Sequence, residues 1–224
     1  MTDTVDNPPA RQVSPPAPPV DGALDTSNYR KHTSGNPVQR VLIGRFHRAI
    51  AERVALLAPG SLLDAGCGEG FVARVLGERL PGTRVVGFDV SPAAAHLAAA
   101  ANPGAAFASA SVFALPFPDA SFDVVGCFEV LEHQADPPPA AALRELARVA
   151  RRAVVLSVPH EPLFSRANAL RGKNLDVRPR GSDPDHRQLW TRSAFGAMVG
   201  ETMDVEWLGG SFPWTICVAR PRRP

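Results

Sequence analysis

A chain of 224 residues with 45% hydrophobic residues has room for one domain with a substantial core. Its formal net charge of +2 gives no global reason to expect a nucleic acid or an anionic membrane as partner. Cys67, Cys127 and Cys217 form no CxxC pair, which argues against a disulfide framework or a zinc ribbon and favours a reducing, cytoplasmic setting. The N-terminus lacks the pattern of a signal peptide, and no apolar run has the length of a membrane span.

The N-terminal part of the chain divides into three segments. Residues 1–27 are rich in Pro, Ala, Asp, Ser and Thr, which predicts a disordered or polyproline tail, with a ligand for a proline-binding partner as the alternative. Segment 28–37 is polar, and 38–57 has the apolar spacing of an amphipathic helix. The residues predicted to face inward on this helix are Val41, Leu42, Phe46, Ile50, Val54 and Leu57.

A glycine-rich stretch follows at 62–70, with the sequence LLDAGCGEG. The apolar lead and the helical spacing after Gly70 predict a strand-to-helix turn, where glycine permits positive φ and close approach of a ligand. The spacing is neither the G-x-G-x-x-G of a dinucleotide site nor a P-loop. Asp64 before the glycines suits a cationic ligand, such as an ammonium or a sulfonium group, and a turn without any ligand is the alternative.

The next segments predict two further strands. Residues 84–91 read as a strand that ends in Asp89, at nearly the interval where a nucleotide-binding fold places its ribose-binding carboxylate. Ser91 before Pro92 is the better candidate to cap the helix that follows. Residues 105–110 are predicted to form a short third strand.

The motifs Leu115-Pro116-Phe117 and Phe122-Asp123-Val124-Val125 precede a buried fourth strand that ends at Phe128. With the glycine stretch and Asp89, they closely resemble the class I S-adenosylmethionine (SAM) dependent methyltransferases of small-molecule type, similar to the ubiquinone-biosynthesis O-methyltransferases. The resemblance covers about residues 37–220. It implies a Rossmann-like, doubly wound α/β fold with a mostly parallel seven-stranded sheet and a C-terminal antiparallel hairpin, in a single domain spanning 28–224.

The resemblance also implies which residues bind SAM. In many members an acid in the position of Ser111 binds the adenine amino group, and a serine there can still accept a hydrogen bond. The segment before the glycine stretch would cover the cofactor, so that Arg40 or Arg45 meets the SAM carboxylate, unless each is a plain surface arginine. The cofactor-binding residues assigned in this way are Asp64, Gly66, Gly68, Asp89, Ser111 and Phe128.

A second group of polar residues follows the fourth strand. Glu129, Glu132 and His133 stand at spacings that share a face on one helical turn, and two carboxylates with an imidazole can hold Mg²⁺ or Mn²⁺. His160 or His186 would complete the shell. This E-x-x-E-H arrangement resembles both the ubiquinone branch and the small-RNA 3′-terminal 2′-O-methyltransferases. Many small-molecule relatives carry a similar motif with no known metal, so the alternative is a structural role.

The C-terminal third is predicted to contain a helix at 140–150, a fifth strand at 153–158, a helix ending near Gly200, and strands 205–208 and 214–219 joined by Gly209-Gly210. Between them, 163–187 is irregular and basic. Because it follows the carboxyl end of a strand, it is predicted to be a substrate-facing insertion, with a solvated loop as the alternative.

These patterns predict a SAM-dependent methyltransferase whose acceptor is a small molecule, with a phenolic, glycosyl or lipid-linked hydroxyl as the methylated group. His133 is the first candidate for the catalytic base, ahead of His160 and His186. Nucleic acid is disfavoured as a partner, although an RNA 3′-terminal ribose 2′-O-methyltransferase remains an alternative. A non-catalytic, SAM-binding regulatory domain is the alternative from another class. The sequence leaves the acceptor and the oligomeric state open.

Overall fold

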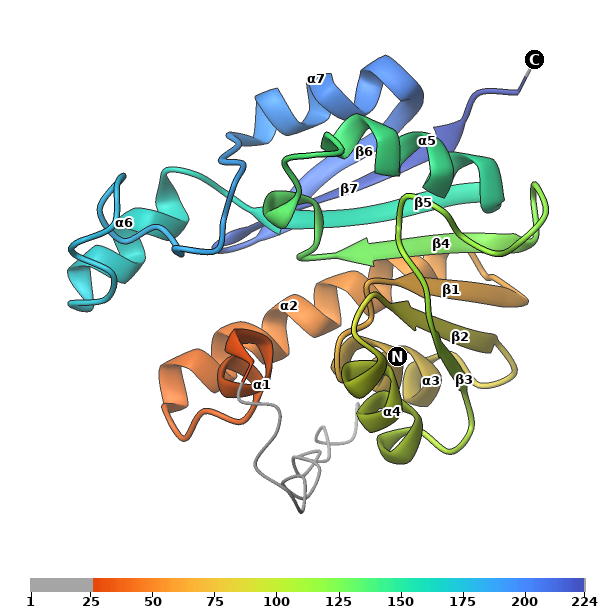
Figure 1. Cartoon of the computed structure of the whole chain (residues 1–224), viewed down its shortest axis with the longest axis horizontal. Coiled ribbons are helices and arrows are strands. Elements are labelled where there is room, and N and C mark those ends of the chain that lie inside the picture. The colour runs from red at the N-terminus through yellow and green to blue at the C-terminus, as the bar shows by residue number, and fades with distance from the viewer. Residues whose placement is uncertain (1–25, 224) are drawn as a thin grey trace, which may run out of the picture.

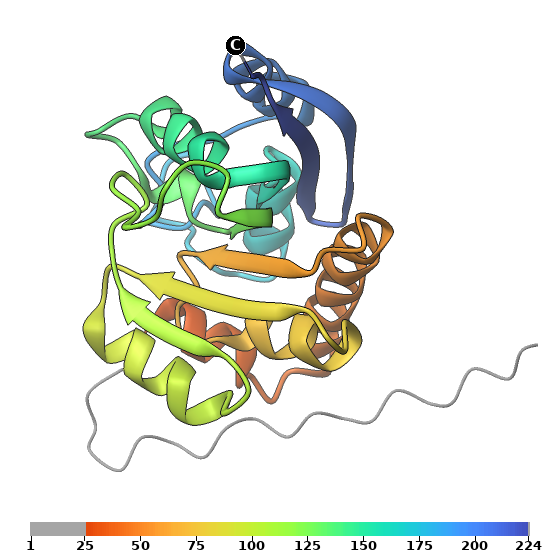
Figure 2. The same cartoon turned by 90° about the vertical axis from the view of Figure 1, so that its right-hand side faces the viewer.

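A seven-stranded sheet runs through the centre of the protein (Figure 1). Its strands are β1 (Ser61–Ala65), β2 (Arg84–Asp89), β3 (Ala106–Ser109), β4 (Phe122–Phe128), β5 (Ala150–Pro159), β6 (Met203–Ser211) and β7 (Trp214–Pro221). The computed structural model describes residues 26–223. The order is β3-β2-β1-β4-β5-β7-β6, with β6 and β3 at opposite ends of the sheet (Figure 2). β1 to β5 pair in parallel and β7 is antiparallel to its two neighbours, which confirms the predicted fold.

Helices cover both faces of this sheet (Figure 1). On one face lie α2 (Pro37–Leu56), α3 (Phe71–Arg79) and α4 (Pro92–Ala101), and on the other lie α5 (Pro139–Val149) and α7 (Arg192–Thr202). Between residues 26 and 223, no helix combines the length and the apolar character needed to cross a membrane.

Strand β1 shows how the sequence fills both cores. Leu62 and Leu63 are both fully buried, but Leu62 belongs to the core that includes Phe46 and Ile50 of α2. Leu63 belongs to the opposite core, which includes Leu143 of α5. Successive side chains of a strand point to opposite faces, so an uninterrupted apolar run buries both of them.

Helix α2 confirms the predicted amphipathic helix but not every inward residue. Phe46, Ile50 and Val54 are buried as predicted, whereas Val41 is 61% exposed and Ile43 takes the buried position instead. The reason is the helical period: at about 100° per residue, Val41 lies on the opposite side of the helix from Ile43.

Two short helices lie in segments for which the sequence predicted no helix. Helix α1 (Ser27–His32) forms in the polar segment, and α6 (Leu163–Leu170) opens the basic insertion. The side chain of Thr26 caps α1 by accepting a hydrogen bond from Tyr29 N at 2.9 Å. The predicted tail 1–27 therefore ends earlier than expected, and its residues 1–25 lie outside the described part of the chain.

One predicted helix cap is confirmed, and one predicted turn is wrong. Ser91 caps α4 as predicted, since its side chain accepts a hydrogen bond from Ala94 N. Gly209 and Gly210 do not form the C-terminal turn but pair with β7 inside β6. Ser211 pairs with Trp214, so the two intervening residues, at 212 and 213, make the hairpin loop.

Candidate active site

A cavity of about 650 Å³ opens at the carboxyl ends of β1, β2 and β4. Its walls come from α1, the start of α2, the glycine loop, the segment after β4, and the insertion that begins with α6. Parallel α/β sheets place ligands at this edge of the sheet. Most of the residues assigned from the sequence to the cofactor or to a metal line this one cavity: Asp64, Gly66, Gly68, Asp89, Ser111, Phe128, Glu129, Glu132 and His133.

The glycine loop has a shape that only glycine fits. Gly66 and Gly68 have φ values of +81° and +52°. A Cβ on Gly66 would lie 2.4 Å from Val130, and one on Gly68 would lie 2.9 Å from Asn28. The N–H groups of Gly66 and Cys67 donate to the carbonyl of Phe88 at 2.6 and 2.8 Å, which fixes the loop against β2. A narrow cradle of backbone therefore borders the cavity.

Asp64 lies in the buried strand β1, one residue before its end, and lines the same cavity. It is only 1% exposed, and its Oδ2 has no hydrogen-bond partner among the described residues. Burial, together with the nearby charge of Asp89, raises the pKa of Asp64 to about 7. A buried carboxylate oxygen without a partner is costly, so this atom fits a cationic or N–H-bearing ligand in the cavity.

Asp89 and Ser111 border the next part of the cavity. The Oδ2 of Asp89 accepts a hydrogen bond from Gly68 N at 2.8 Å, and its Oδ1 accepts one from Ser91 N at 2.9 Å. Each carboxylate oxygen keeps a second acceptor site for a ligand hydroxyl. The hydroxyl of Ser111 accepts from Phe113 N at 3.2 Å, which leaves its own O–H as a donor toward a ligand.

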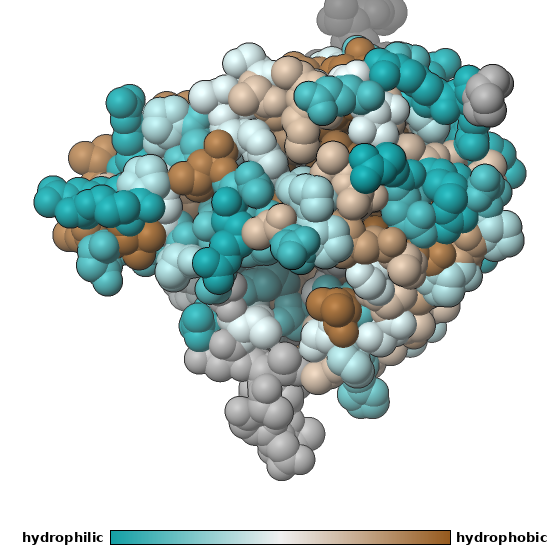
Figure 3. Space-filling model, turned by 45° about the horizontal axis from the view of Figure 1, so that its top comes forward, coloured by the Kyte–Doolittle hydropathy of each residue, from teal (hydrophilic) through white to brown (hydrophobic). Residues whose placement is uncertain are grey.

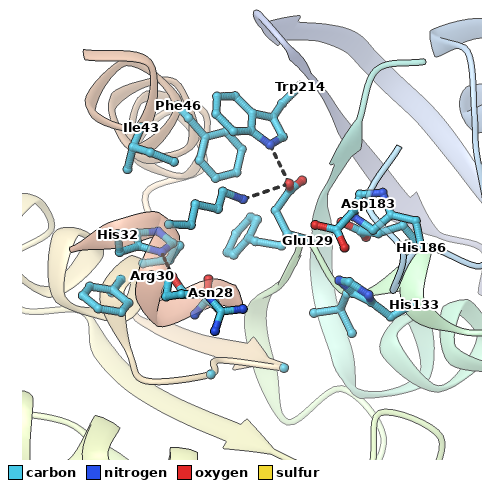
Figure 4. A pocket seen from close by; sticks show the side chains of 18 of the residues that line it. Asn28, Arg30, His32, Ile43, Phe46, Glu129, His133, Asp183, His186 and Trp214 are labelled. Atoms are coloured by element: carbon cyan, nitrogen blue, oxygen red, sulfur yellow. Dashed lines mark hydrogen bonds and ion pairs between the residues drawn. The ribbon is translucent and has the colours of Figure 1, made fainter. Parts of the chain in front are cut away.

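Helix α1 closes one side of the cavity (Figure 4). Thr26 and Asn28 both donate to the carboxylate of Glu69, a 3% exposed residue of the glycine loop. His32 stacks on Phe71 with ring centroids 4.3 Å apart and an interplanar angle of 7°. These contacts hold a short helix of six residues against the glycine loop and the start of α3.

Helix α1 also supplies a cation that the sequence analysis missed. Lys31 Nζ lies 3.3 Å from the Glu129 carboxylate, which also accepts a hydrogen bond from Trp214 Nε1 at 2.5 Å. In Figure 4 the indole of Trp214 points toward Glu129. Arg40 and Arg45 are exposed and neither lines the cavity, which agrees with the alternative that each is a plain surface arginine. Nothing in the local pattern distinguished Lys31 from its polar neighbours.

The E-x-x-E-H motif does not gather on one helical face. Glu129 has a φ of +58° and precedes a single 3₁₀ turn, η1 (Leu131–His133), so the chain bends between the two glutamates. Candidate ligand atoms of Glu132, His133 and His186 lie within 4.8 Å of one another, whereas Glu129 is turned to Lys31. The candidate ligand set in the structure is therefore Glu132, His133 and His186, and it does not include Glu129.

The electrostatics of this second cluster are unusual. Both carboxylate oxygens of Glu132 are buried without a partner among the described residues, and burial raises the pKa of this carboxyl well above its ordinary value. Burial, and then the nearby His133, lower the pKa of His186 to about 4. His133 is exposed and its Nδ1 lies 3.1 Å from the carbonyl of Asp185. His160 does not line the cavity.

Comparisons with known proteins find methyltransferases among the chains that resemble this one. Residues 63–158 match the family described as Methyltransferase domain. The chain is 38% identical over 125 residues to demethylmenaquinone methyltransferase of Thermus thermophilus, covering 53% of this chain and 56% of the relative. It is 39% identical over 106 residues to 2-methyl-6-phytyl-1,4-hydroquinone methyltransferase of Synechocystis, covering 46% and 32%. These matches make the central part of the chain similar to SAM-dependent methyltransferases. The chain spans about half the length of the curated relatives it matches.

Solved structures show the same class I methyltransferase fold. Magnesium protoporphyrin IX methyltransferase from Synechocystis, with bound S-adenosylhomocysteine (SAH), superposes with a TM-score of 0.65 at 23% identity, covering 86% of this chain and 92% of the other. The [4+2]-cyclase SpnF superposes with a TM-score of 0.62 at 16% identity, covering 80% and 82%. Because a cyclase shares this fold, the reaction has to be argued from the cavity.

Proposed function

We propose that this chain transfers the methyl group of SAM to a hydroxyl of a small-molecule acceptor. The main support for the proposal is that one cavity contains both the predicted cofactor-binding residues and the candidate base. The glycine cradle with the unpartnered Asp64 lies in the same volume as the exposed imidazole of His133. Relatives named for the methylation of a demethylmenaquinone and a hydroquinone support an acceptor that carries an aromatic ring.

Asp64, the glycine cradle and Asp89 would hold the cofactor. SAM supplies an activated methyl group when bound, and this chain positions it. Asp64 would accept hydrogen bonds from the ammonium group of the cofactor's methionine end, which explains a buried carboxylate without a protein partner. Asp89 would accept the ribose hydroxyls, while Ser111 and Phe128 would border the cofactor from the ends of neighbouring elements.

His133 would act as the base for the acceptor hydroxyl. A backbone carbonyl can only accept, so the contact with Asp185 O requires the proton of His133 to sit on Nδ1. The lone pair then lies on Nε2, in the cavity. His133 Nε2 would take the proton of the acceptor hydroxyl, and bound SAM would supply the activated methyl group to that oxygen, with SAH as the product. General-base help of this kind contributes about 10²- to 10⁴-fold in rate.

A divalent metal at Glu132, His133 and His186 is the second candidate chemistry. Their proximity, and the two unpartnered oxygens of Glu132, support it. Two imidazoles with one carboxylate suit Mn²⁺, Fe²⁺ or Zn²⁺ better than Mg²⁺. With a metal bound, His133 would be a ligand, and the metal would lower the pKa of the acceptor hydroxyl in its place.

The first experiment measures SAH binding by calorimetry, followed by methyl transfer to a panel of phenolic, glycosyl and lipid-linked acceptors, with a single-stranded RNA included. His133→Asn is expected to lower kcat by about 10²-fold or more while SAH affinity is unchanged. His96→Asn, an exposed histidine of α4, is the matched control. No binding of SAH would refute the proposal. Binding without any methylated product would favour a regulatory domain.

A metal-free preparation separates the two chemistries. The chain is treated with EDTA, freed of the chelator, and assayed alone and with Mg²⁺, Mn²⁺, Fe²⁺ or Zn²⁺. Full activity of the metal-free protein excludes the metal. Activity restored by one ion, and lost in His186→Ala, supports it. If methyl transfer is seen only to the 3′ end of the RNA, the small-molecule acceptor is wrong and the RNA 3′-terminal ribose methyltransferase is supported.

A further inference from the structure

The insertion that follows β5 is tightly folded against α6. Glu161 is 7% exposed and accepts hydrogen bonds from the hydroxyl and the N–H of Ser165 at 2.5 and 3.2 Å. The Ser165 hydroxyl lies 2.9 Å from that of Ser182, and Asn168 donates to Gly181 O at 3.0 Å. A Cβ on Gly181, whose φ is +88°, would lie 1.9 Å from Ser165 O. These contacts give residues 171–182 a defined position beside the cavity.

Two cations of this insertion, Arg171 and Lys173, line the cavity. Within residues 26–223 neither side chain has a carboxylate partner or a side-chain hydrogen bond. Some other cations of this chain are paired, such as Lys31 with Glu129 and Arg148 with two carboxylates, whereas the exposed Arg166 and Arg180 of the same insertion form no ion pair among the described residues. Arg171 and Lys173 are exposed, so they can stay unpaired in solvent; what distinguishes them from Arg166 and Arg180 is that they line the cavity.

Besides these cations, the insertion contributes an aromatic ring and two amides to the lining of the cavity. Phe164 lies 5.6 Å from His186 between ring centroids, at an interplanar angle of 34°. Asn168 and Asn174 also line the cavity. In the sequence they flank the two cations on either side. The acid on this side, Asp183, lies close to His186 (Figure 4). A ligand here meets an aromatic surface at one end and positive charge at the other.

We propose that the methyl acceptor is an aromatic compound with an anionic substituent, a carboxylate or a phosphate, which Arg171 and Lys173 bind. This inference rests on the proposed methyl transfer and assigns its substrate class. A guanidinium presents parallel N–H donors that match the oxygens of a carboxylate or a phosphate, and an ammonium adds a point charge. The ring lies along Phe164, which directs its hydroxyl toward His133.

The same insertion supplies its own controls and one competing explanation. Arg166 and Arg180 are exposed, belong to the same segment, and do not line the cavity.

Leu170 and Leu175 are 89% and 50% exposed, and in Figure 3 this lobe projects at the left with hydrophilic and hydrophobic side chains intermixed. A lobe that docks on an anionic membrane would use all of its cations, whereas a subsite for an acceptor uses only those that line the cavity.

The experiment uses the full chain saturated with SAH. Benzoate, phenyl phosphate and the uncharged benzamide are titrated by calorimetry at constant ionic strength, and inorganic phosphate is added as a competitor. At least one of the two aromatic anions is expected to bind about tenfold more tightly than benzamide, a preference that two partly exposed charge pairs can supply. Arg171→Gln with Lys173→Gln should abolish this preference, and Arg166→Gln with Arg180→Gln should preserve it.

The outcomes are distinguishable. Equal binding of the anions and benzamide, or no detectable binding of either anion, overturns the anionic subsite while SAH binding still supports methyl transfer. An equal loss in both double variants, with sedimentation on phosphatidylglycerol vesicles that depends on all four cations, replaces the subsite by membrane docking. Failure of the wild-type chain to bind SAH would instead defeat the proposed function on which this inference rests.

Discussion

Asp64 concentrates the chemistry of the cofactor site in one side chain. It lies one residue before the end of the buried strand β1, it is 1% exposed, and its Oδ2 has no partner among the described residues. The pKa of about 7 means that near neutral pH half of the ligand-free molecules carry a proton on this carboxyl. A bound ammonium group favours the ionised form, so the binding of cofactor and the loss of this proton are coupled.

We predict a pH-dependent affinity for SAH that Asp64 controls. Because the pKa of Asp64 is raised in the free protein, the carboxyl must lose its proton to meet an ammonium group, and affinity should rise about tenfold between pH 6 and pH 8. Asp64→Asn should bind weakly and without this slope, whereas Asp176→Asn, at an exposed site in the insertion, should behave as wild type. Calorimetry across that pH range measures it, and a slope that persists in Asp64→Asn contradicts the prediction.

Gly66 and Gly44 allow a matched test of the cradle. Gly66→Ala adds a Cβ at positive φ, 2.4 Å from Val130, and should lower the free energy of unfolding by about 1–3 kcal/mol. Gly44 lies in α2 with nothing within 4 Å of an added Cβ, so Gly44→Ala should raise it by about 0.5–1 kcal/mol. Urea denaturation of both variants checks the opposite signs. Equal effects would contradict the strained turn.

At the scale of elements, α1 is a short helix whose position depends on other segments. An isolated helix of six residues is unstable in water, so its contacts with the glycine loop and with α2 must hold it. The two donors to Glu69 and the stack of His32 between Phe71 and His47 are the main ones. The part of the cavity wall that α1 forms therefore depends on these contacts for its stability.

Glu69→Ala should release α1 without unfolding the sheet. The variant removes the acceptor shared by Thr26 and Asn28, so amide exchange in residues 27–32 should accelerate and SAH affinity should fall several-fold. Glu78→Ala, at an exposed position on α3, is the control. Unchanged exchange in residues 27–32 of Glu69→Ala would show that other contacts suffice to dock the helix.

Acid should loosen the same helix through His32 and His47. Burial, and then the charge of Lys31, lower the pKa of both imidazoles, to about 4 for His47. A folded-state pKa below the ordinary 6.5 means that their contribution to stability is present above pH 6.5 and is lost as pH falls toward 4. Amide exchange of residues 27–32, corrected for intrinsic rates, should show less protection at pH 5 than at pH 7. His47→Asn should reduce that difference, and His96→Asn should leave it unchanged.

At the scale of the whole molecule, strand order determines where the cavity lies. The chain runs outward from β1 through β2 to β3, then returns to β4 on the other side of β1. The loops after β1 and β4 therefore diverge, which leaves a crevice at the carboxyl ends of these strands. The glycine loop, Asp89 and the 129–133 segment meet there because each directly follows or ends one of those strands.

Cofactor binding should stabilise the whole domain, because the cavity contacts elements from both faces of the sheet. At a concentration of 100 times its dissociation constant, SAH should raise the free energy of unfolding by about 2.7 kcal/mol. Adenosine, which lacks the methionine end, should stabilise less, and the difference should shrink in Asp64→Asn. Thermal unfolding measures both. Equal shifts with the two ligands would contradict the role of the glycine cradle.

Features that depend on neighbouring residues were predictable from the sequence. The glycine turn, the cap at Ser91, the strand that ends in Asp89 and the amphipathic α2 are local: each follows from allowed φ, from capping or from periodicity over a few residues. The parallel order of the sheet came from the family resemblance that these motifs carry. Local rules also explain the error at Val41, since a stretch of apolar residues admits more than one helical stripe.

Contacts between distant residues required the tertiary structure. Glu129 meets Lys31 and Trp214, which are 98 and 85 positions away, and Glu132 and His133 meet His186 across the insertion. Whether such distant residues meet depends on the path of the loops between them and on how the helices pack against the sheet. A single sequence does not contain these distances. The motifs along the chain were enough to predict a cradle of the SAM-binding type at the glycine loop. Only the packing of α1 and of the α6 insertion decided which residues face its acceptor end.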